Sequence, residues 1–403
     1  MTTTSVDDAD TDSTQQLSST DRRKLQFPPL DTLLKPKFIA QLNDKKDDND
    51  EEDDEDDEED DSSNIIGDVR FLLDFAILGH AKCATSYIMK YLHAHERVQI
   101  WDYEVCDLYD HRPARLVHKL YTELGSNRNR NRNNNNNKLL WRGFKCPGHF
   151  SRQAMRYFRR YFDRTRLIVG LRHPVWWFES YYNFRYRHLT ARPKASSSSG
   201  ASSGFIILPN ATDLASLDAC PPEALGVCVK FAQYHHHLAM FGRTNLTHDN
   251  DEWKLLSGLH EKYRLLTPIG NPIFLYDMQQ LYDTNVQRQG LFRKDLQRFL
   301  GLPTPLPSPD DYNDTDTSGH KSAVRKETRI NICDDEFIPL RQALLQVGRQ
   351  ASDWMLEYFV KAPRVYVSHR PMFEAAVREW KVDPCVQGQR TKIGAGNAAT
   401  SLE

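Results

Sequence analysis

The sequence predicts an α/β protein of three layers, α/β/α, with helices on both faces of a central parallel sheet. Short apolar runs alternate along the chain with segments whose apolar residues have helical spacing, and this alternation is typical of a parallel sheet. The runs are apolar at nearly every position, as expected for strands that are buried on both faces. The first run, Phe71–Leu78, leads directly into a tight turn and a helix, which is the basic unit of this fold class.

The turn of this first unit has residues that suit an anion. It spans Gly79–Ser86, and helical spacing of apolar residues follows it as far as His95. A helix N-terminus offers unpaired N–H groups and a partial positive charge. Lys82 adds a full positive charge, and Thr85 and Ser86 add hydroxyl donors. The unit therefore predicts a phosphate-binding turn at the end of a buried strand.

The later elements are expected where the apolar periodicity changes. Further strands are expected at Arg97–Trp101, at Trp141–Gly148, which runs into a loop, at Arg166–Arg172 and at Pro272–Tyr276. Helices are expected at Arg152–Phe162, Trp176–Tyr186, Leu225–Phe241, Phe292–Leu300, Phe337–Phe359 and Met372–Trp380. His173 and Pro174 end the strand Arg166–Arg172. Gly301 ends the helix Phe292–Leu300.

One folded domain is expected, at residues 65–385. Residues 1–64 are polar and acidic and are expected to be disordered, although a short apolar stretch at residues 25–38 could dock on the body. The remaining irregular segments are two low-complexity insertions near residues 126–137 and 195–204, and a flexible tail at residues 386–403.

The net charge of −2 conceals a basic body. Asp44–Asp61 contains 15 acidic residues and 2 lysines, so the rest of the chain has 51 basic and 40 acidic residues, a net charge of +11. A basic body suits an anionic or phosphorylated ligand, but a solvated surface with an acidic counterweight has the same composition. Charge alone does not separate these two interpretations.

The sequence indicates neither a metal site nor a membrane span. The seven cysteines form no CxxC pair, so they give neither a zinc signature nor a clear disulfide framework. His235, His236 and His237 are consecutive, and consecutive side chains on a helix point in different directions. No segment resembles a signal peptide, and no apolar run approaches the ~20 residues that span a bilayer. As written, the chain is expected to be soluble and cytoplasmic.

The turn differs from a Walker A loop. That loop places its Lys directly after a second glycine. In this sequence Lys82 follows Gly79 by three positions, and no glycine precedes Thr85 and Ser86. The pattern therefore disfavours an ATPase or kinase of the usual P-loop type.

The spacing of the turn resembles that of another class of enzyme. The order Gly79-x-x-Lys82-x-x-Thr85-Ser86 is similar to the 5′-phosphosulfate-binding loop of sulfotransferases that use 3′-phosphoadenosine 5′-phosphosulfate (PAPS). The overall pattern is closest to the carbohydrate or heparan-type members of that family, and the resemblance covers roughly residues 70–303. It implies a P-loop-like sulfotransferase domain.

Three later features agree with this resemblance. Arg172 closes a strand and Ser180 lies eight residues later, as in the family's 3′-phosphate-binding motif. The segment Tyr103–Tyr109 looks like the family's E-x-x-F-F segment, with Leu-Tyr in place of the aromatic pair. Phe299–Pro303 is similar to the family's late FLGLP helix end. Each motif is common by itself, but four in the family's order and spacing form a specific pattern.

The resemblance implies PAPS as co-substrate and no metal. Lys82 would lie on the oxygen that bridges phosphate and sulfate, and Gly79 would open the turn. The 5′-phosphate would be held by the N–H groups of Lys82, Cys83, Ala84, Thr85 and Ser86, with the two hydroxyls. Arg172 would bind the 3′-phosphate beside Ser180, as a guanidinium fork suits phosphate.

The acceptor side of the site is also implied by the resemblance. Glu104 would remove the proton of the acceptor, and Lys145 would face the sulfuryl oxygens or orient Glu104. His80 and His149 are alternative bases. The expected partners are the nucleotide donor and a carbohydrate or small-molecule acceptor, without nucleic acid. The sequence names neither the acceptor nor the oligomeric state.

Two residues of the turn have open interpretations. Ala84 stands where the family usually has glycine, and it would be strained there if its φ is positive but tolerated if its φ is negative. Cys83 lies beside Lys82 at a helix N-terminus, which would favour a thiolate. Because no partner residues for a nucleophilic cysteine are evident, we interpret Cys83 as a small residue that fills the loop.

Two other functions and a second location stay open. A P-loop-type nucleotide kinase would need ATP and magnesium, and Asp277 is the evident candidate for the metal. A non-catalytic nucleotide-binding protein would fit the alanine at position 84. Family members that sulfate glycans are usually Golgi proteins, so the resemblance makes the Golgi lumen the alternative to the cytoplasm.

Overall fold

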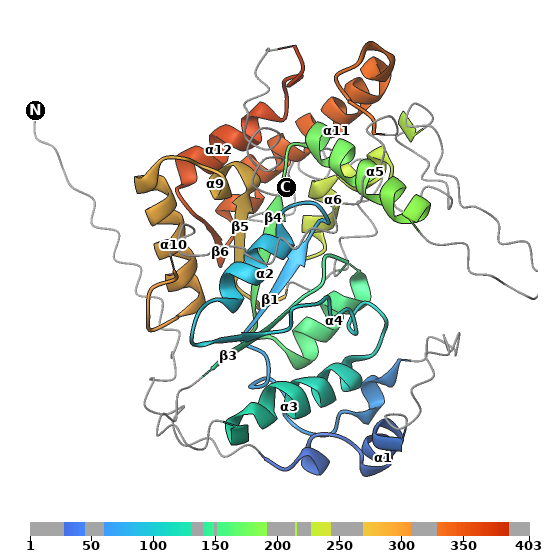
Figure 1. Ribbon diagram of the computed structural model, residues 1–403, viewed down its shortest axis with the longest axis vertical. Helices are drawn as coiled ribbons and strands as arrows, with labels where there is room; N and C mark the ends of the chain where they lie inside the picture. Colours follow the sequence, from blue (N-terminus) through green and yellow to red (C-terminus); the bar gives the residue numbers. More distant parts are fainter. Residues whose placement is uncertain are drawn as a thin grey trace, which may run out of the picture.

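The computed structural model describes residues 28–44, 60–130, 140–148, 151–191, 214–215, 227–242, 269–307 and 329–386, with backbone alone at the ends of two helices, residues 125–130 and 186–191. In this part of the chain six strands form one sheet (Figure 1). They are β1 Phe75–Gly79, β2 Val98–Ile100, β3 Trp141–Lys145, β4 Arg166–Leu171, β5 Ile273–Asp277 and β6 Val365–Val367. The strand order is β2-β3-β1-β4-β5-β6, and all neighbours are parallel.

Helices connect the strands and cover the sheet. They are α1 Pro36–Asp44, α2 Thr85–His93, α3 Pro113–Arg130, α4 Arg152–Tyr161, α5 Pro174–Ala191, α6 Tyr234–Ala239, α9 Met278–Leu281, α10 Val286–Leu300, α11 Ile338–Glu357 and α12 Arg370–Glu379. Short 3-10 turns lie at Leu30–Thr32, Asp61–Asn64, Val229–Ala232, Asp335–Phe337 and Phe359–Lys361.

The two faces of the sheet have separate hydrophobic cores. Alternate residues of a strand point to opposite faces, and in β1 Ala76 and Leu78 pack with α3, α4, α5 and α11, whereas Phe75 and Ile77 pack with α2 and α10. Every residue of β1 is buried. The predicted fold class, a three-layer α/β/α protein with a central parallel sheet, is therefore confirmed.

The apolar runs located the buried strands well, but the strand β6 and the helices α1, α3 and α9 were not expected. β6 has three half-exposed or exposed residues, too few for a clear apolar run. α3 begins at Pro113, a favoured first position of a helix, and extends to Arg130 into the expected insertion near residues 126–137. The expected helix Leu225–Phe241 is shorter in the described part, where a 3-10 turn precedes α6. The expected insertion at residues 195–204 lies outside the described residues.

Part of the N-terminal region belongs to the body. Leu33 and Leu34 are buried in the larger core, and Leu34 forms a bridge with Ile65. Residues 28–44 therefore dock on the domain, as the apolar stretch within residues 25–38 suggested, rather than sharing the disorder expected for residues 1–64. The flexible tail at residues 386–403 stays a prediction.

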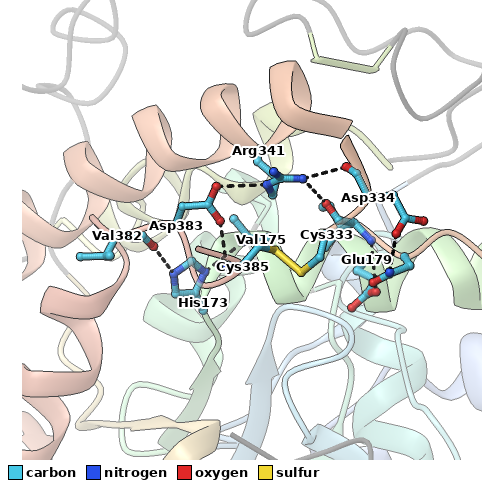
Figure 2. Close-up of a disulfide and its surroundings, with 11 residues drawn as sticks. His173, Val175, Glu179, Cys333, Asp334, Arg341, Val382, Asp383 and Cys385 are labelled. Carbon is cyan, nitrogen blue, oxygen red and sulfur yellow. Dashed lines mark hydrogen bonds and ion pairs between the residues drawn. A yellow bond between two sulfur atoms is a disulfide. The ribbon is translucent and has the colours of Figure 1, made fainter. Parts of the chain in front are cut away.

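The cysteines form a disulfide framework that their spacing did not indicate. The described residues contain the disulfides Cys106–Cys146 and Cys333–Cys385, and Cys228 is also disulfide-bonded. Figure 2 shows the second disulfide beside Arg341, which binds Asp383 and the carbonyl of Asp334. The partners lie 40 and 52 positions apart, so the fold brings them together. Across the described part of the chain, no helix combines the length and the apolar character that a membrane span needs.

Candidate active site

The site lies at the carboxyl ends of the central strands, where ligands of open parallel sheets bind. β1 has β3 on one side and β4 on the other. The segment from His80 to Ala84, called the anion loop here, connects β1 to α2. Gly79 ends β1 with a φ of 124°, a conformation that side chains rarely adopt. The predicted strand, turn and helix are therefore present.

Three side chains bind three successive carbonyl groups of the anion loop. Trp177 Nε1 donates to the carbonyl oxygen of Ala81 over 2.9 Å. Arg172 Nη1 lies 3.4 Å from the carbonyl oxygen of Lys82, and the Tyr276 hydroxyl donates to that of Cys83 over 2.9 Å. These side chains come from α5, from the end of β4 and from β5. They hold the loop against the β4–β5 side and neutralise the carbonyl dipoles that would repel an anion.

Gly170 of β4 makes this close approach possible. A Cβ atom at this position would lie 2.4 Å from the Tyr276 hydroxyl and 2.6 Å from the Cys83 carbonyl oxygen. No role in the site was predicted for Gly170, Tyr276 or Trp177. The glycine inside an otherwise apolar strand was the available signal, because such glycines often mark a close backbone approach.

Two residues of the loop have left-handed backbone conformations. Lys82 has a φ of 67°, and Ala84 has a φ of 59° and a ψ of 26°. Ala84 is the N-cap of α2, so it stands in the strained one of the two conformations left open by the sequence. The ammonium of Lys82 lies 4.4 Å from the centre of the Phe184 ring, which holds the lysine beside α5.

Cys83, which belongs to the anion loop, and Thr85, the first residue of α2, are both buried. The Cys83 side chain has no exposed surface, and burial raises the pKa of its thiol, although the positive charge of Arg172 acts in the opposite direction. The expectation that the helix N-terminus would favour a thiolate is therefore wrong. Its interpretation as a small residue that fills the loop fits this burial. Thr85 begins α2 and is also buried.

A lysine joins the anion loop unit to the candidate base. Lys145 Nζ donates to Ser86 Oγ over 2.7 Å and lies 2.6 Å from Glu104 Oε1. The lysine is the last residue of β3 and its side chain is 4% exposed, whereas that of Glu104 is 51% exposed. The structure therefore brings three of the predicted residues into one contiguous chain of polar groups. The carboxylate lies at the solvent side of this chain, where an acceptor could reach it.

Arg172 and Ser180 lie in the β4–α5 unit on the other side of β1. Arg172 follows β4, and Ser180 is a half-buried residue of α5. Burial raises the pKa of Tyr282, and the charge of Arg172 acts against this shift, so the guanidinium lies near the carboxyl end of β5 as well. Two predicted groups of residues thus flank the anion loop, with Lys145 and Glu104 on the β3 side and Arg172 on the β4 side.

His80 is a poor candidate for the base. It is buried, and its ring centre lies 4.3 Å from that of Tyr234 and 4.9 Å from that of His237. Burial lowers the pKa of its imidazole well below the usual value, with a further lowering from His237. His149 lies outside the described residues. Among the residues that are described, no three His, Cys, Asp or Glu side chains are grouped so as to hold a metal ion.

Asp277 is enclosed at the end of β5. It is 1% exposed, and its carboxylate accepts a 2.8 Å hydrogen bond from the N–H of Gln279. The Asp277 N–H donates to Gln280 Oε1 over 2.9 Å, so the two residues form a capping box for α9. Burial raises the pKa of Asp277 to about 7. This carboxylate has a structural role as a helix cap.

Comparisons with known proteins add little to this geometry. No protein-family model matches the sequence, and no curated protein matches it. Among solved structures, a sulfotransferase from Alicyclobacillus acidocaldarius is similar, with 14% sequence identity and a TM-score of 0.34. The matched region covers 71% of this chain and 96% of that chain. A likeness at this level carries no argument about activity.

Proposed function

We propose that the protein is a sulfotransferase that transfers the sulfuryl group of PAPS to a hydroxyl or amine of an acceptor, a carbohydrate or a small metabolite. One observation carries the proposal. Lys145 contacts both Ser86, in the first turn of α2 beside the anion loop, and the carboxylate of Glu104. This arrangement places a cation between an anion-binding loop and a potential general base. Transfer of an anionic group to a hydroxyl requires these three functions side by side.

The donor side of the site would use the anion loop and the β4–α5 unit. The N-terminus of α2 and the side chains of Thr85 and Ser86 suit the 5′-phosphate of the donor. Arg172, which already lies against the loop, suits the 3′-phosphate together with Ser180. Lys82 would turn from the Phe184 ring to the bridging oxygen. These assignments follow the family resemblance and the position of each residue around β1.

The reaction would be an in-line displacement at sulfur. Glu104 would accept the proton of the acceptor hydroxyl or amine while the acceptor atom forms a bond to sulfur. The bond between sulfur and the 5′-phosphate oxygen would break, and its electron pair would stay on that oxygen. Lys82 would stabilise this developing charge, and Lys145 would stabilise the sulfuryl oxygens or fix the position of Glu104. The products are the sulfated acceptor and adenosine 3′,5′-bisphosphate.

The kinase interpretation is less well supported by the geometry. Its metal would need Asp277, and that carboxylate is buried and caps α9. Burial also raises the pKa of Asp277 to about 7, which weakens a carboxylate as a ligand of a hard cation. The non-catalytic interpretation rested on Ala84. The contact between Lys145 and Glu104 argues for catalysis, since nucleotide binding alone does not require an exposed carboxylate held on a buried lysine.

The disulfides favour the lumen of the secretory pathway as the place of action. Disulfides form and persist in oxidising compartments and are rare in the cytosol. Both Cys106–Cys146 and Cys333–Cys385 are formed in this protein, and Cys228 is also bonded. We therefore propose the alternative location given by the family resemblance rather than the cytoplasm.

Calorimetric titration with adenosine 3′,5′-bisphosphate tests the donor site. The protein is expected to bind this product more tightly than ADP, without magnesium. Arg172→Ala should weaken binding roughly 10- to 100-fold, the effect of losing a charged hydrogen bond. Arg378→Ala, at an exposed arginine of α12, is the matched control. Equal affinity for ADP together with a magnesium requirement would overturn the proposal. Transfer from radiolabelled PAPS to a panel of glycans and phenols then tests catalysis.

A further inference from the structure

The segment that carries Glu104 has no regular secondary structure. It comprises residues 101–110 and connects β2 to the turn before α3. A general base must lie within hydrogen-bond reach of the proton that it removes, and a displacement of about 1 Å can cost roughly a hundredfold in rate. An exposed carboxylate on an irregular segment does not hold such a position by itself. The contacts of residues 101–110 therefore decide where Glu104 lies.

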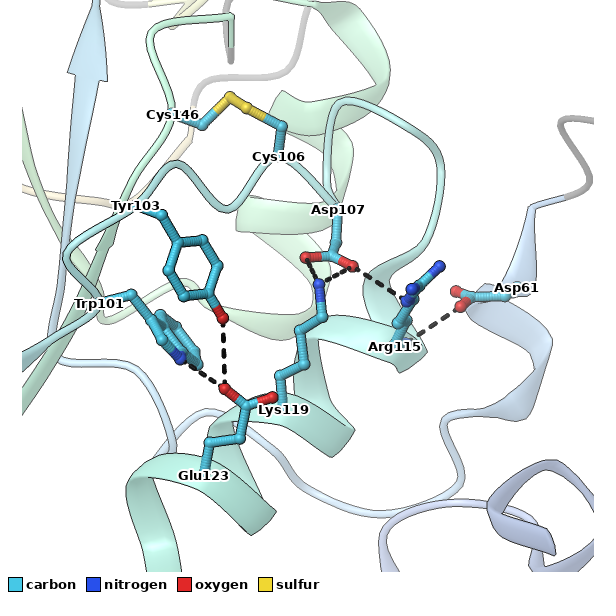
Figure 3. Close-up of polar contacts among 9 residues, drawn as sticks. All are labelled: Asp61, Trp101, Tyr103, Cys106, Asp107, Arg115, Lys119, Glu123 and Cys146. Carbon is cyan, nitrogen blue, oxygen red and sulfur yellow. Dashed lines mark hydrogen bonds and ion pairs between the residues drawn. A yellow bond between two sulfur atoms is a disulfide. The ribbon is translucent and has the colours of Figure 1, made fainter. Parts of the chain in front are cut away.

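Two anchors attach this segment to α3 (Figure 3). Before Glu104, Trp101 Nε1 donates to Glu123 over 2.7 Å, and the Tyr103 hydroxyl donates to the same carboxylate oxygen over 3.4 Å. After Glu104, the buried carboxylate of Asp107 accepts two hydrogen bonds from Lys119 Nζ, over 3.0 and 2.9 Å. Both anchors fix the segment on α3. Neither of them fixes Glu104 relative to β3 and its lysine.

A covalent bond makes that second connection. Cys106 lies two positions after Glu104, and Cys146 directly follows Lys145. The disulfide between them therefore joins the segment to the end of β3 within two residues of the ion pair. A single backbone hydrogen bond accompanies it, from the Val105 N–H to the Lys145 carbonyl oxygen over 2.9 Å. Figure 3 shows the disulfide beside Asp107, away from the Trp101 anchor.

We propose that the Cys106–Cys146 disulfide is a positioning device that holds Glu104 on Lys145, so that full activity depends on its oxidised state. This inference rests on the proposed function, because it assigns Glu104 as the base. When the disulfide is formed, the Glu104 segment and the end of β3 are covalently joined and move together. After reduction, the segment keeps its apolar contacts in the core through Val105 and Leu108. Near Glu104 it is then joined to β3 by the Val105 hydrogen bond and by the ion pair with Lys145, whose carboxylate partner is half exposed. The proposed donor-binding residues lie in the anion loop, in α2 and α5 and directly after β4, and none of them belongs to the Glu104 segment; Lys145 of β3 contacts them through Ser86.

The redox step is thiol–disulfide exchange. Formation of the bond removes two electrons and two protons from the thiols of Cys106 and Cys146 and transfers them to a disulfide-containing oxidant. Dithiothreitol reverses this step, because it gives two electrons and two protons to the bond and itself becomes a cyclic disulfide. Cys83 lies buried in the anion loop and takes no part.

The double variant Cys106→Ser/Cys146→Ser tests the proposal, with Cys333→Ser/Cys385→Ser as the matched control. The control removes a disulfide at the α11–α12 side of the protein, away from β3. Removal of the first pair should lower kcat about 10- to 100-fold, while the affinity for adenosine 3′,5′-bisphosphate stays within about twofold. The control should lose stability but keep kcat within about twofold. Equal losses of kcat in both pairs would show a general effect of destabilisation and would overturn the proposal.

A second experiment separates positioning from a merely structural role. In a Glu104→Gln background, removal of the first disulfide should cause no further loss of kcat, because the group that it positions is already gone. A full additional loss would contradict the proposal.

Amide hydrogen exchange supplies a readout that does not depend on activity. The Val105 amide should lose protection in the first double variant and keep it in the control. Unchanged protection of Val105 would overturn the positioning role whatever the enzyme assays show. Absence of sulfate transfer by the unmodified protein, with exchange behaving as expected, would instead count against the proposed function.

Discussion

The phenolic hydroxyl of Tyr276 donates a 2.9 Å hydrogen bond to the carbonyl oxygen of Cys83, and this bond joins the end of β5 to the anion loop. Both residues are fully buried. The loop therefore takes its shape partly from a residue 193 positions away. Gly170 lies between them, and no larger residue would leave room for the bond.

Tyr276→Phe should loosen the anion loop. The substitution keeps the ring but leaves the buried Cys83 carbonyl without its donor, which costs about 1–3 kcal/mol. We expect a lower free energy of unfolding by roughly that amount, measured by urea denaturation, and weaker binding of adenosine 3′,5′-bisphosphate. Tyr366→Phe, at an exposed tyrosine of β6, is the control and should change neither quantity. Unaltered stability of Tyr276→Phe would show that the hydrogen bond is not important for the loop.

Ala84→Gly should stabilise the protein. A left-handed conformation costs an L-residue roughly 1–2 kcal/mol, and glycine lacks this cost, although its greater freedom in the unfolded chain offsets part of the gain. We expect an increase of up to about 1 kcal/mol in the free energy of unfolding. Ala94, at the other end of α2, has a φ of −66°, so Ala94→Gly should have the opposite sign. A loss of stability in both variants would contradict the strain at Ala84.

Glu104→Gln tests the assignment of the base. Glutamine keeps the shape of the side chain and can still accept a hydrogen bond from Lys145, but it does not accept the acceptor's proton. We expect kcat to fall roughly 10²- to 10⁴-fold, the usual contribution of general base catalysis, with unchanged affinity for the nucleotide product. Glu357→Gln, at an exposed residue near the end of α11, is the control. An enzyme with full kcat would show that the base is another group.

Asp277→Asn should change how stability depends on pH. The native pKa of Asp277 is raised by burial from 3.8 to about 7, so the native state binds its proton more tightly than the unfolded state. This carboxyl contributes stability below pH ~4, and the contribution is lost as pH rises from ~4 to ~7, by roughly 4 kcal/mol in total. Asparagine does not titrate and can still cap α9.

The difference between wild type and Asp277→Asn isolates this group from the buried histidines, which act in the opposite direction. The free energy of unfolding of the variant, relative to wild type, should therefore increase between pH 4 and pH 8, as measured by urea denaturation at several pH values. Asp335→Asn, at an exposed residue, provides the reference curve. If the free energies of unfolding of Asp277→Asn and wild type differ by a constant amount across this pH range, the native pKa of Asp277 is not raised and the prediction is wrong.

The buried strands were predictable because burial on both faces leaves a continuous apolar run. Arg166–Leu171 and Ile273–Asp277 were located within a residue or two in this way. α3 contained a usable signal, since Leu116, Leu120 and Leu124 recur every four residues and are buried. The polar sequence that follows Leu124 hid this pattern. β6 has too little burial to leave any pattern.

Only part of the candidate site could be predicted from the sequence. The anion loop is local, so its residue types indicated an anion directly. The pairing of Lys145 with Glu104 joins positions on different strands and loops, and its location came from the family resemblance rather than from spacing. The disulfides had no sequence signal, because partners 40 and 52 positions apart meet only when the strand order is known. The same holds for Tyr276, whose role depends on which strand lies beside β4.

The central place of β1 in the sheet has a consequence for the evolution and redesign of this protein. Its two neighbours carry different parts of the candidate site, with the proposed nucleotide-binding residue Arg172 towards β4 and the candidate base towards β3. Changes on the β2–β3 side that keep Lys145, which contacts Ser86, are therefore expected to leave the proposed nucleotide half unaltered. Under the proposed function, a chimaera that exchanges the stretch from β2 to Cys146 for that of another protein of this fold, with the lysine before the cysteine retained, is expected to keep the co-substrate and to take a new acceptor. Since this stretch includes both Cys106 and Cys146, the exchanged piece would bring with it the disulfide that positions its own candidate base.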